Sequence, residues 1–158
     1  MNTSGAATPL STQVYATRME RARELMAERD VDVLLLSLGL DLPYISGYTA
    51  MPLERLTMLV VPREGAATMV IPRLEAPRVT AQPGVFDLHP WNETENPVEI
   101  VANLVRAGGP VRRVAVGDQT WARFVVELIP LLAGATFMRA DVVSALRLVK
   151  DQTEIDAL

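Results

Sequence analysis

The chain has 158 residues, of which 49% are hydrophobic and 22% are charged, and its formal net charge is −4. This composition predicts one soluble globular domain, and the acidic balance without a run of Lys or Arg argues against binding to nucleic acid or to an anionic membrane surface. The absence of cysteine excludes disulfides, thiolate nucleophiles and cysteine-ligated metals. No apolar stretch approaches the ~18 residues of a membrane span, so we expect a cytoplasmic protein.

Residues 1–11 are rich in Ser, Thr, Gly and Ala and lack the basic and apolar regions of a signal peptide, which predicts a flexible tail. A helix is expected from Ser11 or Thr12, either of which can cap it, to Asp30, which suits the left-handed residue after a helix. Arg18 and the other charged residues are expected away from its buried face, which has helical spacing. The predicted buried residues are Tyr15, Met19, Ala22 and Met26.

A β-hairpin is the clearest signal in the first half of the chain. Residues 31–36 predict a strand buried on both faces because they are short, mostly apolar and β-branched at their start. Residues 56–61 and 67–71 are apolar runs on either side of Pro62-Arg63-Glu64-Gly65, a turn whose glycine suits a positive φ. At least part of the sheet is therefore predicted to be antiparallel.

The second half is predicted to alternate helices and strands. Residues 73–82 are predicted to be helical with Pro77 in the first turns, residues 85–88 to form a strand, and residues 89–94 a loop. Asn96-Pro97-Val98-Glu99 is a strong helix start, with a capping residue, proline at the first helical position and an acid in the first turn.

The remaining elements complete the order. They are a strand over 113–116, a helix with the apolar stripe Trp121, Phe124, Val125, Leu128 and Leu132, a strand over 135–138, and a helix capped by Asp141 that ends at Leu148. Strands that alternate with helices, together with one hairpin, predict an α/β fold with a mixed sheet covered on both faces.

Residues 150–158 have the pattern of one more helix. Asp151 and Glu154 have the spacing of a capping box, and Ile155 and Leu158 begin an apolar stripe. Because isolated helices shorter than ~12–15 residues are marginal in water, we expect the start of a linker helix into a domain that is absent from this chain.

The residues offer little for catalysis. His89 is the single histidine, which excludes a multi-histidine metal site, and no Gly-x-Ser-x-Gly elbow accompanies it. Glycine-rich phosphate-binding motifs are missing as well. Several carboxylates lie in predicted loops or at element ends, where acids are usually solvated: Asp41, Glu54, Glu75, Asp87 and Asp118. We therefore predict no catalytic, metal-binding or cofactor-binding residue in this chain.

The segment from Tyr44 to Arg55 is less ordinary, because it carries two aromatic residues and a charged pair with little regular periodicity. In one interpretation, Tyr44 and Ile45 pack inward while Glu54 and Arg55 contact solvent. In the other, the segment faces a partner or a substrate, as irregular loops with function often do.

The same segment carries a family resemblance. Tyr44-Ile45-Ser46-Gly47-Tyr48 resembles the Tyr-Leu-Thr-Gly-Phe segment of amino-terminal domains in the creatinase, prolidase and aminopeptidase P family. Glu54-Arg55 before an apolar strand, the turn Pro62-Arg63-Glu64-Gly65 and the strand end Val70-Ile71-Pro72 are similar to features of that family in the same order.

A second resemblance lies near the end of the sequence. Leu146-Arg147-Leu148-Val149-Lys150-Asp151 with Glu154-Ile155 resembles the Leu-Arg-x-Ile-Lys-Ser/Thr-x-x-Glu-Ile junction that leads into the family's catalytic pita-bread domain. The match covers residues 12–158. It implies a family-type amino-terminal domain over residues 12–149, followed by the start of the linker helix over residues 150–158.

The resemblance implies a three-layer, ribonuclease-H-like domain with a mixed, roughly six-stranded sheet. The parent protein would be a metal-dependent Xaa-Pro peptidase or a related hydrolase. Its two divalent ions (Mn, Co or Zn, or none in a creatinase) would be held by the absent carboxy-terminal domain. This chain would be non-catalytic, helping to form a homo-oligomer and narrowing the entrance to a neighbouring subunit's active site. The residues implied in that contact are Tyr48, Glu54 and Arg55.

Two alternatives remain open at this point. A stand-alone, doubly wound ligand-binding or interaction module, such as a receiver, would use clustered acids and a later lysine. Here only Asp41 and Asp118 lie near such places, and Lys150 is the sole lysine. A naturally short interaction protein that kept the domain without the enzyme is the other alternative. The residues do not separate the peptidase branch from the creatinase branch.

Overall fold

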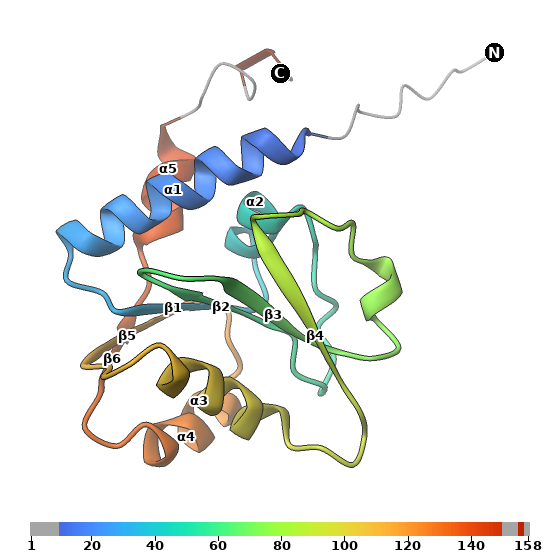
Figure 1. Cartoon of the computed structure of the whole chain (residues 1–158), viewed down its shortest axis with the longest axis vertical. Coiled ribbons are helices and arrows are strands. Elements are labelled where there is room, and N and C mark those ends of the chain that lie inside the picture. The colour runs from blue at the N-terminus through green and yellow to red at the C-terminus, as the bar shows by residue number, and fades with distance from the viewer. Residues whose placement is uncertain (1–9, 150–154, 157–158) are drawn as a thin grey trace.

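A computed structural model describes residues 10–149 and 155–156. Six strands form one sheet with the order β4-β3-β2-β1-β5-β6, as Figure 1 shows. The helices and strands are α1 (Thr12–Glu28), β1 (Val33–Leu36), α2 (Asp41–Ser46), β2 (Met58–Pro62), β3 (Ala67–Pro72), the 3₁₀ turn η1 (Ala76–Arg78), β4 (Phe86–Trp91), α3 (Pro97–Ala107), β5 (Arg113–Val116), α4 (Ala122–Leu131), β6 (Thr136–Arg139) and α5 (Val142–Leu148).

The sheet is mixed, as predicted. β2 pairs antiparallel with both β1 and β3, whereas the β1–β5, β5–β6 and β3–β4 pairs are parallel. The predicted hairpin is the β2–β3 pair, and Gly65 in its turn has a φ of 98°. Parallel neighbours need crossover connections, which here are made mostly by helices. The three-layer α/β prediction is therefore confirmed.

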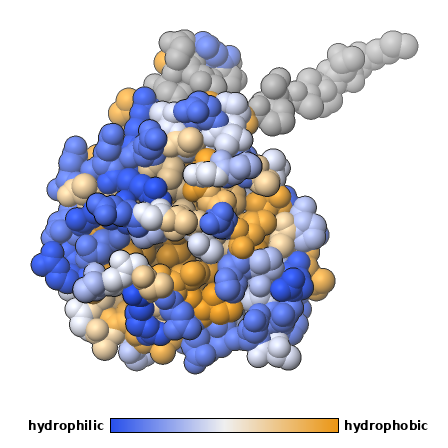
Figure 2. Space-filling model, viewed as in Figure 1, coloured by the Kyte–Doolittle hydropathy of each residue, from blue (hydrophilic) through white to orange (hydrophobic). Residues whose placement is uncertain are grey.

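Helices cover both faces of the sheet (Figure 1). α1, α2 and α5 pack on one face, and α3 and α4 pack on the other. Successive side chains of β1 alternate between the two faces. Leu34 and Leu36 pack in the core beneath α1, α2 and α5, and Val33 and Leu35 pack in the core beneath α3 and α4. In Figure 2, hydrophobic side chains gather across the middle of the visible face, between the two helical layers. Within the described ranges, no helix combines the length and the apolar character that crossing a bilayer requires.

Most local helix signals are confirmed. Tyr15, Met19, Ala22 and Met26 are buried on α1, and Asp30 takes a positive φ of 54°. The Asn96 side chain caps α3 by accepting hydrogen bonds from the N–H groups of Val98 and Glu99, at 3.0 and 3.4 Å. Asp141 is at the cap position of α5 but makes no capping bond. It pairs instead with Arg29 at 2.5 Å, because α1 packs beside α5.

The predicted helix over residues 73–82 is wrong, since only the single turn η1 forms there. This connection must return the chain to the start of a parallel strand. Six-residue strands rise about 20 Å, because each residue adds about 3.3 Å. A ten-residue helix covers only about 15 Å, so a more extended path is needed.

The predicted loop over residues 89–94 is also wrong in its first half, because β4 continues to Trp91. His89 and Pro90 lie opposite Val70 and Ile71 in the parallel ladder. Proline usually ends a strand because it lacks an N–H, but β4 is an edge strand with one side unpaired, where this loss is tolerated.

Arg18 contradicts the prediction for the charged faces of the first helix, because it is buried. Its guanidinium donates a hydrogen bond of 2.9 Å to the carbonyl of Tyr44 and lies 4.0 Å from the centre of the Tyr44 ring. Stacking on an aromatic face and hydrogen bonding together compensate for the burial of an arginine. The cause is the packing of α1 on α2, which helical spacing alone does not reveal.

The predicted tail and linker helix fall largely outside the described residues. The capping-box residues Asp151 and Glu154 lie there, as does Leu158. Ile155, which is described, is helical and exposed. The division into tail, domain and linker therefore stays a prediction.

Candidate interface site at the carboxyl end of the sheet

The candidate site is built around the segment 47–57, which links α2 to β2. Gly47 ends α2 with a φ of 77°, and a Cβ at this position would lie 2.8 Å from the Tyr15 hydroxyl. Glycine is therefore needed for its conformation and for the close approach of α1. The Ser46 hydroxyl donates to the carbonyl of Leu42 and accepts from the N–H of Tyr48 at 3.1 Å, which fixes the direction in which the segment leaves the helix.

Tyr48, near the start of this segment, is only 8% exposed and belongs to the core that α1 and α2 cover. Burial, followed by the negative charge of Glu75, raises the pKa of the Tyr48 phenol, and the positive charge of Arg78 partly opposes this rise. Glu75 and Arg78 form an ion pair of 3.2 Å on the connection between β3 and β4. Arg78 also lies 2.9 Å from the sulfur of Met51. Tyr48 thus belongs to the hydrophobic core and not to the exposed part of the segment.

Glu54 and Arg55 lie on the surface, as the simpler of the two interpretations predicts. Arg55 forms an ion pair of 3.0 Å with Glu93, which follows β4. The next residue, Leu56, is buried, and its carbonyl accepts a 2.9 Å hydrogen bond from the indole N–H of Trp91. The exposed charges therefore sit directly above an anchored backbone.

The tip of the segment is apolar and exposed. Met51 is 45% exposed and Leu53 is 41% exposed, with Pro52 between them also on the surface. Three consecutive apolar side chains that remain exposed make this surface a candidate for contact with a partner. We call residues 51–55 the 51–55 tip.

A hollow of ≈ 580 Å³ lies beside this tip. Trp91 and Phe124 contribute aromatic lining, and the residues that begin α3 form another wall. Glu54 and Arg55 both line it, whereas Tyr48 does not. Its charged residues are Glu54, Arg55, Glu93, Glu95, Arg123 and Glu127. The excess of carboxylates over guanidinium groups suits a positively charged group better than a phosphate.

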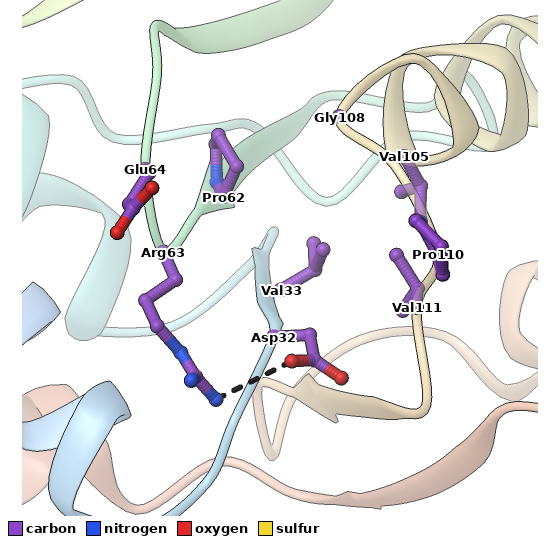
Figure 3. A pocket seen from close by; sticks show the side chains of 9 residues that line it. All are labelled: Asp32, Val33, Pro62, Arg63, Glu64, Val105, Gly108, Pro110 and Val111. Atoms are coloured by element: carbon purple, nitrogen blue, oxygen red, sulfur yellow. Dashed lines mark hydrogen bonds and ion pairs between the residues drawn. The ribbon is translucent and has the colours of Figure 1, made fainter.

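A second pocket, of ≈ 260 Å³, lies at the opposite end of the strands and is shown in Figure 3. Arg63, which follows β2, reaches toward Asp32, which precedes β1, at a distance of 3.3 Å (Figure 3). The other carboxylate oxygen of Asp32 accepts hydrogen bonds from the N–H groups of Arg112 and Arg113, at 2.8 and 2.9 Å. Arg63 also pairs with Asp30 at 3.2 Å. We call Asp32, Arg63, Asp30 and the backbone N–H groups of Arg112 and Arg113 the Asp32 cluster.

The Asp32 cluster joins three segments of chain. Burial alone would raise the pKa of Asp32, but the two backbone N–H groups and the charges of Arg63 and Arg112 outweigh it and hold the pKa below its ordinary value. Since these groups satisfy one another, the cluster stabilises the fold and offers no free group for catalysis. Sequence reasoning missed it, although a single acid within the otherwise apolar run of residues 31–36 was a visible signal.

Residues 18–149 match the Creatinase/Prolidase N-terminal domain family. The chain belongs to this family. It is 36% identical to the probable dipeptidase PepE of Mycobacterium tuberculosis over 149 residues, which make up 92% of this chain and 39% of that protein. The chain therefore spans well under half the length of this relative and is similar to the amino-terminal domain of prolidase- and dipeptidase-like proteins.

Solved structures agree with this assignment. Dipeptidase PepE from Mycobacterium ulcerans has a TM-score of 0.83 and 34% identity, with 96% of this chain and 41% of that chain covered. The N-terminal domain of an Xaa-Pro dipeptidase from Lactobacillus brevis has a TM-score of 0.73 and 20% identity, with 84% and 99% covered. At that identity, the second similarity concerns the fold alone.

A metal centre of the kind implied for the creatinase/prolidase parent does not fit this domain. Within residues 10–149 and 155–156, no group of three His, Cys, Asp or Glu side chains is placed to hold a metal ion. His89 is half-buried on β4, away from the 51–55 tip in sequence and absent from the lining of the hollow beside it. We therefore derive no catalytic step through a metal from the residues of this family member.

Proposed function

We propose that this chain is the non-catalytic amino-terminal domain of a metal-dependent Xaa-Pro peptidase or of a creatinase-like hydrolase. Its function would be to associate with other copies and to narrow the entrance to a neighbouring subunit's active site. The two divalent ions of a peptidase parent would be held by a carboxy-terminal pita-bread domain, and the protein would be cytoplasmic. Family membership and the 39% share of the relative's length support this assignment.

The observation that carries the gating proposal is the contrast within segment 47–57. Its base is held by Trp91 and by the Ser37 hydroxyl, which donates a 2.6 Å hydrogen bond to the carbonyl of Thr57. Its tip exposes two large apolar side chains and the charges of Glu54 and Arg55. A fixed base with an exposed tip suits a rim that limits substrate length, since a rim must hold its position while it contacts the substrate.

The first experiment assays this chain with Xaa-Pro dipeptides in the presence of Mn²⁺ or Co²⁺. We expect no turnover, because the residues for metal-activated attack of water on an amide are assigned to another domain. Appreciable turnover by this chain alone would refute the non-catalytic role. The genomic reading frame gives an independent check. Coding that continues beyond Leu158 into His, Asp and Glu clusters supports the proposal, whereas a stop codon there favours a short interaction protein.

The gating role is tested in the parent enzyme with Glu54→Gln and Arg55→Ala. We expect kcat/KM for tripeptides and tetrapeptides to change relative to the value for dipeptides, since longer substrates would contact the rim. Glu64→Gln, in the β2–β3 turn, is the matched control and should leave this ratio unchanged. An equal ratio in all three variants would contradict gating by the 51–55 tip.

A further inference from the structure

The outer strand β6 has one open edge. Among the described residues, it pairs only with β5, at the end of the sheet. The N–H groups of Thr136 and Ala140 donate to the carbonyls of Arg112 and Val116. The backbone N–H and C=O groups of the even-numbered residues in this stretch therefore point toward β5. Because bonding directions alternate along a strand, the N–H and C=O groups of Phe137 and Arg139 point outward. The edge thus presents two donors and two acceptors to a further strand.

An apolar stripe on α4 adjoins this edge. Ala122, Val126 and Ile129 are spaced at i, i+4 and i+7 on the outer face of the helix, where Val126 is 65% exposed and Ile129 is 48% exposed. Val125, on the neighbouring face, lines a shared hollow with Phe137 of β6, so α4 and the edge lie side by side. The exposed apolar side chains of α4 therefore lie near an edge whose own surface is mixed, with Phe137 beside the ion pair between Arg139 and Asp118.

The opposite edge of the sheet is protected against pairing. The carbonyl of Trp91 accepts from the N–H of Arg73. The backbone hydrogen-bonding groups of the odd-numbered residues of β4 therefore point toward β3. Pro90 consequently faces outward, where its missing N–H and its ring obstruct an additional strand. β6 contains no proline. Of the two edges, only β6 keeps its full set of outward hydrogen-bonding groups.

We propose that β6 pairs with β6 of a second copy of this chain, antiparallel and about a two-fold axis at Met138. This register places Phe137 opposite Arg139, and each such pair exchanges both of its hydrogen bonds. It also sets the Arg139 guanidinium beside an aromatic ring and brings the two α4 stripes together on one face of a continuous sheet.

The occupant is a second copy because the edge complements itself. A two-fold axis at this position pairs each outward N–H group of one copy with an outward C=O group of the other copy. Both copies then use the same surface, as an isologous interface requires. The inference rests on the association part of the proposed function and assigns that association to a surface remote in sequence from the 51–55 tip.

The first test measures the mass of this chain by sedimentation velocity over a range of concentrations. We expect a dimer for the native sequence. Arg139→Pro removes an outward N–H without disturbing the ladder to β5 and should give a monomer. Arg139→Ala loses the same side chain, including its 3.2 Å ion pair with Asp118, but keeps the N–H and should remain dimeric. A monomeric native chain, or a dimeric Arg139→Pro variant, would overturn the inference.

Disulfide cross-linking tests the register of the β6–β6 pair. Because the sequence has no cysteine, an introduced cysteine is the sole thiol in each copy. Two Met138 residues at the axis would form a non-hydrogen-bonded pair with Cα atoms about 4.5 Å apart, within the range that a disulfide spans. Met138→Cys should therefore form covalent dimers under mild oxidation. Leu74→Cys, at an exposed site after β3, should not. Equal cross-linking by both variants would contradict the register.

The remaining variants separate this inference from the proposed function. Ile129→Lys should weaken dimerisation by at least tenfold, and it decides the matter if Arg139→Pro fails to fold. Leu74→Lys should have no effect. If Leu53→Lys abolishes association while Ile129→Lys does not, the contact lies at the 51–55 tip. That result overturns the β6 interface and leaves the proposed function standing.

Discussion

The two ends of the sheet carry charged groups that are used in opposite ways. At the amino end of β1, Asp32 is surrounded by Arg63 and by the backbone N–H groups of two residues that lead into β5. At the carboxyl end, Glu54 and Arg55 stand on the surface above a buried backbone. The first arrangement fixes strands to one another. In the second, Arg55 pairs with the exposed Glu93, and Glu54 has no ion pair among the described residues.

This contrast shows that a pocket lined by charge is not by itself evidence of a binding site. The pocket in Figure 3 contains Asp32 and Arg63, but their charges already compensate each other within the fold. The hollow beside the 51–55 tip has more carboxylates than guanidinium groups, and Glu54 forms no ion pair within the described part of the chain. Uncompensated charge is what makes this end the better candidate for recognition.

The largest expected effect is on stability at the amino end. Asp32→Ala removes the acceptor of two backbone hydrogen bonds and should lower the free energy of unfolding by about 2–3 kcal/mol, since bonds to charged groups contribute most. Urea denaturation measures this change. Asp30→Asn is the matched control: it removes a more exposed carboxylate that forms only ion pairs and keeps a residue that tolerates the φ of 54°, so we expect less than about 1 kcal/mol. Equal losses in the two variants would contradict the special role of Asp32.

A smaller effect is expected at the base of the candidate site. Trp91→Phe keeps an aromatic ring at this buried position, although a smaller one, and leaves the carbonyl of Leu56 without its indole donor. The lost hydrogen bond should cost about 1–2 kcal/mol. Hydrogen exchange should accelerate in residues 51–57 more than in β1. Trp121→Phe keeps its stacking on Phe124 and serves as the control. If exchange rises uniformly along the chain, Trp91 does not anchor this segment in particular.

Local rules predicted the elements whose signals are local. Asn96-Pro97 predicted the start of α3 because a side-chain cap and a proline at the first position act within one turn. The errors arose where distant parts of the chain decide. Residues 73–82 must span the length of a strand, and Pro90 is tolerated only because β4 lies at the edge of the sheet. Neither fact is visible within a short window of sequence.

The candidate site was predictable only in outline. The irregular segment from Tyr44 to Arg55 was recognised, and the exposure of Glu54 and Arg55 agrees with one interpretation. The burial of Tyr48 was not foreseen, because it depends on a core assembled from helices and strands that are distant in the sequence. The Asp32 cluster was missed for the same reason: its members come from three separate segments.

The dependence of stability on pH should distinguish two acids of opposite behaviour. The pKa of Asp32 is lowered in the folded state, so its contribution is complete above the unfolded pKa of about 3.9 and is lost as pH falls through the folded pKa. Burial raises the pKa of Asp41, although the charge of Arg147 opposes it. The folded state then binds the Asp41 proton more tightly. The contribution of Asp41 to the free energy of unfolding is therefore complete below the unfolded pKa and is lost as pH rises through the folded pKa.

Unfolding in urea at a series of acidic pH values tests these signs. Asp32→Asn should reduce the loss of stability on acidification, because the variant has no carboxylate to protonate at this position. Asp41→Asn should make the loss steeper, because it removes a contribution of the opposite sign. Parallel profiles for the two variants would show that the surroundings of Asp32 and Asp41 do not differ as the structure describes.

The smallest expected effect on stability is at the 51–55 tip. Glu54→Ala and Arg55→Ala should each change the free energy of unfolding by less than about 0.5 kcal/mol, because both side chains are exposed and surface ion pairs such as Arg55–Glu93 contribute little. The measurement matters because it removes one explanation for any functional effect. If these variants alter substrate-length selection in a parent enzyme while the domain stays equally stable, the cause is contact rather than unfolding. A loss of several kcal/mol would instead show that both residues stabilise the fold, as the Asp32 cluster does.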